Sequence, residues 1–210
     1  MSIRTFCLLV AGLFASAGAA AQSLPKPDEF YFDADPTTTR PIVAVKETGD
    51  AAIQKLLKAI ERNPRAKEEH AQLAHLAMEG GRADLGKDLY ARALARVTSS
   101  DALWRPLVWN YGWDLLRSGD ADGALAQWQQ VVTLRRSNAS WIPPTLALAL
   151  WSAGRKDEAL QWYAAAVRTE PQQWRDPANF PRLLPEWRES ERATLAEVEA
   201  AWAANPPAWP

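Results

Sequence analysis

The sequence predicts an all-α protein: a solenoid of repeated helix-turn-helix units, preceded by an extended N-terminal leader and closed by a C-terminal capping helix. Three observations predict this class. Apolar residues recur every three or four positions from residue 51 onward, which is the spacing of one-sided helices. A glycine falls inside the turn of each full helix pair, and one pattern of small and bulky residues returns along the chain.

The first 21 residues have the pattern of a Sec signal peptide. Arg4 supplies a positive charge, residues 6–14 are an apolar run, and small residues lead up to Ala21. The run is shorter than the about 20 apolar residues that cross a bilayer. Cleavage would remove Cys7, the single cysteine, and leave a mature chain without disulfides or thiol sites. We therefore expect secretion across the inner membrane into the periplasm, with no transmembrane segment in the mature chain.

A leader rich in proline and threonine follows, at residues 22–50. Its prolines are Pro25, Pro27, Pro36 and Pro41. This density of proline disfavours helix, so we expect an extended segment. Its aromatic patch at residues 30–32 either forms a docking strand or lies on the folded body.

Helix then follows helix. Asp50 is a suitable N-cap for the first, and Pro64 follows its end. Gly81, Gly119 and Gly154 mark turns between later helices. The predicted helices cover residues 51–62, 67–79, 84–97, 102–118, 122–135, 142–153 and 156–170.

The second helix of each pair carries a small residue, then a bulky one four positions later, then a small or apolar one three positions further on. The first small residue of this pattern is Ala52, Gly86, Ala124 or Ala159. Subtracting successive positions gives steps of 34, 38 and 35 residues. The long step places about four extra residues near 97–105, where we expect a less regular joint.

This pattern resembles the tetratricopeptide repeat, a helix-turn-helix unit of about 34 residues. In that family, small residues let the two helices approach closely, a large aromatic side chain fills the gap between neighbours, and proline often ends the second helix. The best match runs from Gly154 to Ala159 and continues with Tyr163, Ala166 and Pro171. The small positions of the first helices match Ala74, Gly112 and Ala147.

The resemblance implies a half repeat followed by three full repeats. We place them at residues 51–64, 67–98, 102–136 and 140–171. Stacked repeats leave an apolar face open at each end, so residues 172–210 are expected to supply a capping helix and a tail rich in proline and tryptophan. The expected cap, at residues 185–204, has Trp187, Leu195, Val198 and Trp202 inside and Arg188, Glu189, Glu191, Arg192, Glu197 and Glu199 on its wet side.

Composition and motifs argue against several functions. A net charge of −1 supplies no basic stripe for nucleic acid. His70 and His75 are the two histidines, and their spacing of five turns them to different faces of one helix, so we expect no metal site. The sequence contains no nucleophile elbow, phosphate-binding glycine loop or zinc-protease motif. We therefore expect no catalytic residues and no cofactor.

All eleven tryptophans lie at or beyond Trp104. On the repeat template, the inner surface of each first helix lines a concave groove for extended ligands. The predicted partner-binding groove consists of Trp109, Trp113, Leu116, Trp141, Leu148 and Trp151, with Pro144 beside them. His75 takes an equivalent place in the first full repeat, which makes that end of the groove polar. The aromatic side chains either bind a partner or pack beneath the leader or the C-terminal tail, where Trp209 is a candidate occupant.

The expected function is a non-catalytic protein–protein interaction module of the bacterial cell envelope that binds a peptide or protein partner. Some members of the resembled family clamp a ligand's carboxylate, but here Asn110 is the lone amide near the aromatic groove, which argues against such a clamp. An apolar, proline-containing or aromatic peptide suits these walls better. The alternatives are a permanent structural subunit, including a self-associating one, and a carbohydrate-binding or enzymatic groove.

Overall fold

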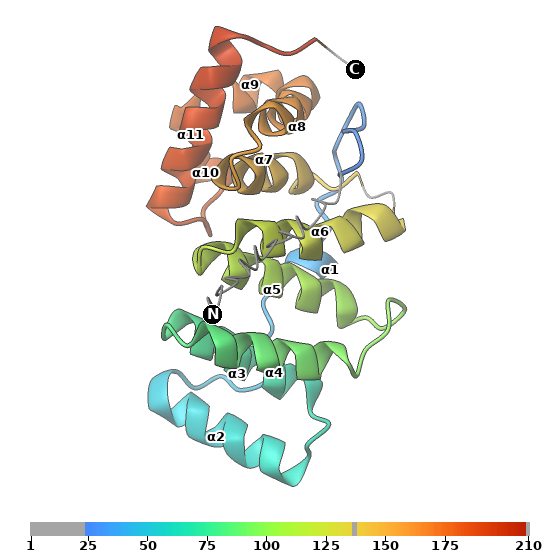
Figure 1. Cartoon of the computed structure of the whole chain (residues 1–210), viewed down its shortest axis with the longest axis vertical. Helices are drawn as coiled ribbons and strands as arrows, with labels where there is room; N and C mark the ends of the chain where they lie inside the picture. Colours follow the sequence, from blue (N-terminus) through green and yellow to red (C-terminus); the bar gives the residue numbers. More distant parts are fainter. Residues whose placement is uncertain (1–23, 136–137, 209–210) are drawn as a thin grey trace, which may run out of the picture.

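The computed structural model describes residues 24–135 and 138–208, which form an elongated stack of helices (Figure 1). The predicted signal peptide, Cys7 and Trp209 lie outside the described residues. The long helices are α2 (Gly49–Arg62), α3 (Lys67–Glu79), α4 (Ala83–Leu94), α5 (Trp104–Arg117), α6 (Ala121–Arg135), α7 (Ile142–Ser152), α8 (Lys156–Thr169) and α11 (Glu189–Ala204). Single turns form α1 (Pro36–Thr39), α9 (Pro171–Trp174), η1 (Pro177–Asn179) and α10 (Phe180–Leu183).

Three hairpins of helices build the stack: α3 packs on α4, α5 on α6, and α7 on α8. The turns of these hairpins contain Gly81, Gly119 and Gly154, with φ angles of +74°, +89° and +78°. This left-handed conformation is strained for residues with a Cβ, so glycine lets each chain reverse within a few residues. The all-helical class is confirmed for the described part of the chain, and α3 begins and ends where the sequence predicts.

The repeated pattern of small and bulky residues lies at the helix contacts. The bulky members are Leu56, Tyr90, Trp128 and Tyr163, and each is at most 1% exposed. A Cβ on Gly112 would lie 2.3 Å from Nε1 of Trp128, so the indole occupies the space that the missing side chain leaves. The small residue on α5 therefore allows the close approach of α6.

Most helix ends differ from the sequence expectation by one to four residues, and the first and last long helices show why. The first long helix begins at Gly49, with Thr48 as its N-cap, so Asp50 lies within the first turn. A carboxylate there still favours the helix, because the N-terminal end of the helix dipole is positive. At the other end of the chain α11 begins at Glu189, four residues later than predicted, with Arg188 as its N-cap.

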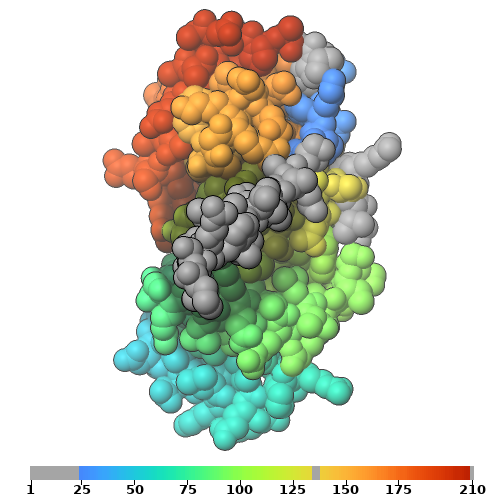
Figure 2. Space-filling model, in the orientation of Figure 1, coloured from blue at the N-terminus to red at the C-terminus, as the bar shows by residue number. Residues whose placement is uncertain are grey.

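The leader crosses the stack from the α8 end toward α2 (Figure 1), and Figure 2 shows its first part, in blue, on the surface near the α8 end. Its single helical turn, α1, begins at Pro36, since proline is tolerated at the first position of a helix. Near the start of the leader, Tyr31 is 3% exposed, and its amide donates to Oγ1 of Thr169 on α8. Further along, an isolated β-bridge joins Asp33 to Ala139, in the connection before α7.

The middle and end of the leader bind the first helices of the hairpins. The carboxylate of Asp35 accepts from Nη1 of Arg105 at 3.1 Å and from Nε1 of Trp141 at 3.2 Å. The side chain of Gln72 on α3 accepts from the amides of Ala44 and Val45, both at 2.8 Å. The leader thus connects hairpins that are far apart in the stack.

The C-terminal helix α11 packs on α7 and α8, with Leu195 and Val198 fully buried. The expectation that Glu191 lies on the wet side of this helix is wrong, because the residue is 8% exposed. It accepts two hydrogen bonds from Arg117 on α5, at 2.8 and 3.2 Å, and one from the amide of Arg188. None of the helices in the described part of the chain is both long enough and apolar enough to cross a bilayer.

Candidate binding cleft

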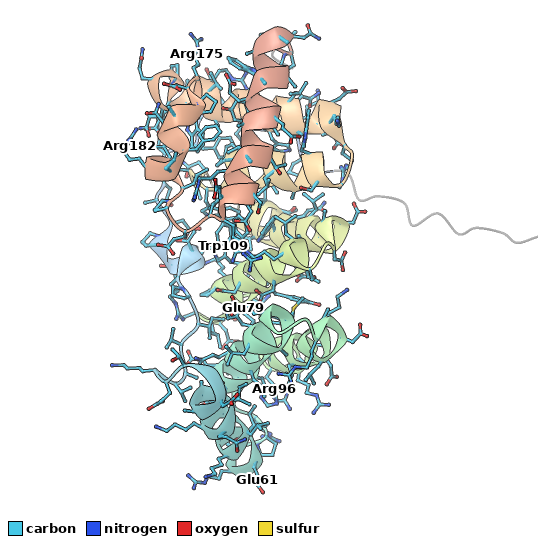
Figure 3. All side chains as sticks on the ribbon, turned by 90° about the vertical axis from the view of Figure 1, so that its left-hand side faces the viewer. Glu61, Glu79, Arg96, Trp109, Arg175 and Arg182 are labelled. Carbon is cyan, nitrogen blue, oxygen red and sulfur yellow. The ribbon has the colours of Figure 1, made fainter. Side chains whose placement is uncertain are left out.

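A cleft of about 660 Å³ opens where the leader, α3, α5, α7 and the segment before α11 meet. Four tryptophans supply its aromatic lining: Trp109, Trp113, Trp141 and Trp187. Polar groups from three of these parts of the chain complete it: His75, Glu79, Asn110, Asp114, Arg117 and Glu186. We call this feature the four-tryptophan cleft. In Figure 3, Trp109 and Glu79 lie near mid-height of the molecule, far from Glu61 at the α2 end.

The four indoles form one connected set of edge-to-face contacts. The ring of Trp109 lies 4.5 Å from that of Trp141 and 5.6 Å from that of Trp113, centroid to centroid. Trp187 continues the set, with its centroid 5.0 Å from that of Trp113. Each of the four is only 7–9% exposed, so these side chains are part of the core as well as the wall of the cleft.

Three of the six groove residues predicted from the sequence meet in this cleft: Trp109, Trp113 and Trp141. Leu116 and Leu148 instead line a separate pocket of about 230 Å³ beside α11. Trp151 lies outside both pockets, where its Nε1 donates to Glu197 of α11 at 3.1 Å. The predicted groove residues are divided between two places because α11 packs along α7. It covers the C-terminal part of the face that the sequence predicts to be an open groove.

Apart from Pro144, Asn110 and His75, which the sequence placed at or near the groove, the other groups of the cleft were not indicated by the sequence. Trp187 was assigned to the interior of the cap, but it precedes α11 and turns to Trp113. The charged residues of the cleft share no short sequence motif. They come from α3 (Glu79), α5 (Asp114 and Arg117) and the segment before α11 (Glu186). The available signal was His75, whose place in the first repeat is equivalent to a groove position.

A buried carboxylate organises the polar floor. Asp114 is 3% exposed and accepts from the hydroxyl of Tyr90 at 2.6 Å. Nδ1 of His75 lies 2.9 Å from its other oxygen, and Nε2 of His75 is 3.5 Å from Glu79. The hydrogen bond to Asp114 raises the pKa of His75, although partial burial of the ring opposes the shift. Burial raises the pKa of Tyr90 well above its usual value, so this phenol stays protonated and donates.

A cation already rests on the aromatic wall. The guanidinium carbon of Arg117 lies 5.0 Å from the ring centroid of Trp113. The charge of Arg117 is balanced by its two hydrogen bonds to Glu191. The remaining carboxylates of the lining, Glu79 and Glu186, are exposed to solvent.

The chain's own leader runs along the rim. Thr39 and Pro41 line the cleft, and the carbonyl of the intervening Arg40 accepts from Nδ2 of Asn110 at 3.0 Å. The amide near the aromatic wall therefore binds backbone of an extended segment. This contact is the kind that reads a peptide main chain without regard to its side chains.

The two histidines are placed differently, as their spacing predicts. His70 is 2% exposed, and its Nδ1 lies 2.5 Å from the carbonyl oxygen of Ala66, whereas His75 reaches the cleft. In residues 24–135 and 138–208, no group of three or more His, Cys, Asp or Glu side chains is arranged to hold a metal ion. A scan against protein-family models finds no match, and a search of curated proteins finds no significant one.

Proposed function

We propose that this protein is a non-catalytic interaction module of the bacterial cell envelope that binds a peptide segment of a partner protein in the four-tryptophan cleft. The observation that carries the proposal is an open cleft walled by tryptophans, with an extended segment of the chain already bound through its backbone at the rim. Tryptophan is enriched among the residues that dominate binding energy at protein interfaces. The volume of about 660 Å³ lies within the range of about 300–1,000 Å³ that is usual for ligand sites.

The proposal includes a tetratricopeptide-like solenoid as the scaffold. Three packed hairpins, glycine turns in the left-handed conformation and the close contact of Gly112 with Trp128 support it. In such a scaffold, the first helices α3, α5 and α7 form one continuous surface, and these are the helices that line the cleft.

Localisation in the periplasm is the second part of the proposal, and residues 1–21 support it by their composition. It predicts that the protein purified from the envelope of a Gram-negative host begins at Gln22. An N-terminus at Met1, found by mass spectrometry of that protein, would contradict export.

Peptide binding is tested by selection from a phage-displayed library of random heptapeptides on the purified protein. The strongest peptide is then titrated by calorimetry against two matched variants. We expect Trp187→Leu to weaken binding at least tenfold, since this side chain closes one side of the cleft. Trp202→Leu, in which the replaced indole packs on Tyr163 outside the cleft, should bind like the parent. Equal affinity of the two variants would show that the cleft is not the binding site.

The choice of Trp187 follows from its neighbours, since all four cleft tryptophans are similarly buried. Trp109 and Trp113 also contact the fully buried Trp128, and truncating core tryptophans to alanine costs about 3–5 kcal/mol of stability. Loss of binding in such variants would therefore report unfolding as readily as a lost contact. Trp187 lies in a connecting segment and contacts Trp113, so its replacement by leucine removes a side chain from outside the helices, and circular dichroism checks that the variant is folded.

A further inference from the structure

We propose that the four-tryptophan cleft selects a basic side chain, that of arginine or lysine, on the peptide it binds. This inference rests on the proposed peptide-binding function and names the chemistry of its ligand. It follows from the charges that line the cleft and from the way the molecule's own cations contact indole rings.

The charge of the lining is the first step. Among the described residues that line the cleft, Glu79 of α3, Asp114 of α5 and Glu186 before α11 carry carboxylates, whereas Arg117 is the one arginine and lysine is absent. The guanidinium of Arg117 is already bound to Glu191. Glu79 and Glu186 approach the cleft from different parts of the chain, and the side chain of Glu79 is 47% exposed. Nε2 of His75 lies 3.5 Å from Glu79, so a basic group that enters the cleft shares Glu79 with His75 and gains Glu186, whereas an acidic group is repelled.

The aromatic wall is the second step. Indole faces attract cations because the ring quadrupole is negative above and below its plane. The molecule uses this attraction twice: Arg117 lies over Trp113 at 5.0 Å, and Nζ of Lys156 lies 4.3 Å from the centroid of Trp151. A basic side chain of a ligand has an apolar stem as well as a charge, so it can pack against the tryptophans and keep its head near the carboxylates.

A purely apolar peptide fits the same lining less well. It would remove the exposed carboxylates Glu79 and Glu186 from water and supply no positive charge in return, which is costly. The mixed lining of tryptophan and carboxylate therefore discriminates between ligands through both attraction and desolvation.

The inference is tested with the peptides recovered from the random heptapeptide library. We expect arginine or lysine to be enriched at one position. In the strongest peptide, that residue is made arginine and then replaced by citrulline, which keeps the shape of arginine and removes its charge. Citrulline should weaken binding to the parent protein about tenfold. The double variant Glu79→Gln/Glu186→Gln should reduce this difference to about twofold or less, whereas Glu61→Gln, at the far end of the stack, should leave it unchanged (Figure 3).

The outcomes separate the two proposals. The recovered peptides could lack a basic residue and still depend on Trp187 for binding. That result would overturn the charge preference, and the proposed peptide binding in the cleft would stand. An equal affinity for the arginine and citrulline peptides would do the same. Failure to recover any peptide whose binding depends on Trp187 would overturn both.

Discussion

At the scale of single residues, Gly112 on α5 and Gly86 on α4 are both small positions of the repeat, one on a first helix and one on a second, and they have different neighbours. A Cβ on Gly112 would meet three atoms of the Trp128 indole within 2.9 Å, and that indole is fully buried. A Cβ on Gly86 would lie 2.1 Å from Cγ of Met78 and 3.1 Å from the carbonyl oxygen of Ala74, and the unbranched Met78 side chain can move aside by rotation about χ1. A rigid neighbour and a flexible one therefore give the two glycines different tolerance of a methyl group.

We predict that Gly112→Ala lowers the free energy of unfolding by about 1–3 kcal/mol, the usual cost of overpacking. Gly86→Ala should cost less than 1 kcal/mol, because the gain in helix propensity offsets the shift of Met78. Urea unfolding followed by circular dichroism measures both. A Gly112→Ala protein as stable as the parent would disprove the close contact between α5 and Trp128.

The pair of His75 and Asp114 couples stability to pH. Because the pKa of His75 is raised in the folded protein, proton binding stabilises the fold. This stabilisation is fully present below the ordinary histidine pKa of 6.5 and is lost as the pH rises through the raised value. The charged groups that face His75 are Asp114, Glu79 and Arg117, of which Asp114 has the largest effect.

We therefore predict that Asp114→Asn lowers the pKa of His75, measured by NMR titration of the imidazole signals. The variant should also lose more stability, relative to the parent, at pH 5.5 than at pH 8.5. Glu68→Gln, which alters an exposed carboxylate on the same helix as His75, serves as the control. An unchanged His75 titration in Asp114→Asn would show that the hydrogen bond does not set the pKa.

The role of a residue could be predicted from the sequence where its position in the repeated pattern determines that role. The bulky positions Tyr90, Trp128 and Tyr163 were recognised because the pattern recurs, and each is buried. Asp114 and Glu191 were not recognised, since their partners Tyr90, His75 and Arg117 lie on other helices. Pairing across 24 to 74 positions leaves no local signal in a single sequence.

At the scale of elements, the carboxylate of Asp35, near the middle of the leader, binds the leader to two of the helix hairpins. Asp35 adopts a φ of 41° and receives hydrogen bonds from both Arg105 and Trp141. Its carboxylate thus joins the leader to the start of α5 and to the residue before α7. Aspartate and asparagine tolerate this left-handed conformation, so Asp35→Asn alters the charge with little backbone strain.

We predict that Asp35→Asn loosens the leader before the hairpins. Hydrogen exchange should rise at residues 33–45 while α5 and α8 remain protected, and the free energy of unfolding should fall by about 1–2 kcal/mol. Asp28→Asn is the matched control, because Asp28 is exposed and contributes its backbone amide, not its carboxylate, to the hydrogen bond with Tyr31. Equal exchange in the two variants would contradict an anchoring role for Asp35.

Helix positions were the most predictable feature at this scale. Periodicity and turn glycines locate the long helices, because these signals act within a few residues. The start of α11 was placed too early, since a proline at residue 185 is as compatible with the preceding turn as with the first turn of a helix. The route of the leader had no such signal, because its hydrogen bonds reach residues up to 138 positions away.

At the scale of the whole molecule, the cleft forms because the leader and α11 cover only parts of one face of the stack. The leader lies along the rim, α11 covers Leu148 and Trp151 at one end, and the region between them stays open. The sequence predicted an aromatic face from helical spacing and so placed Trp109, Trp113 and Trp141 together. Which part of that face is covered depends on segments packed from both ends of the chain, and the repeat pattern carries no information about them.

The central claim is that the four tryptophans of the cleft bind the peptide, and their indole N–H signals test it directly. A ¹H–¹⁵N NMR spectrum resolves these signals by residue once single Trp→Phe variants assign them. On addition of the strongest library peptide, the account predicts shifts at Trp109, Trp113, Trp141 and Trp187, with Trp162 and Trp202 unmoved. Shifts confined to Trp151 and Trp202, or no shift at the four cleft signals under saturating peptide, would contradict it.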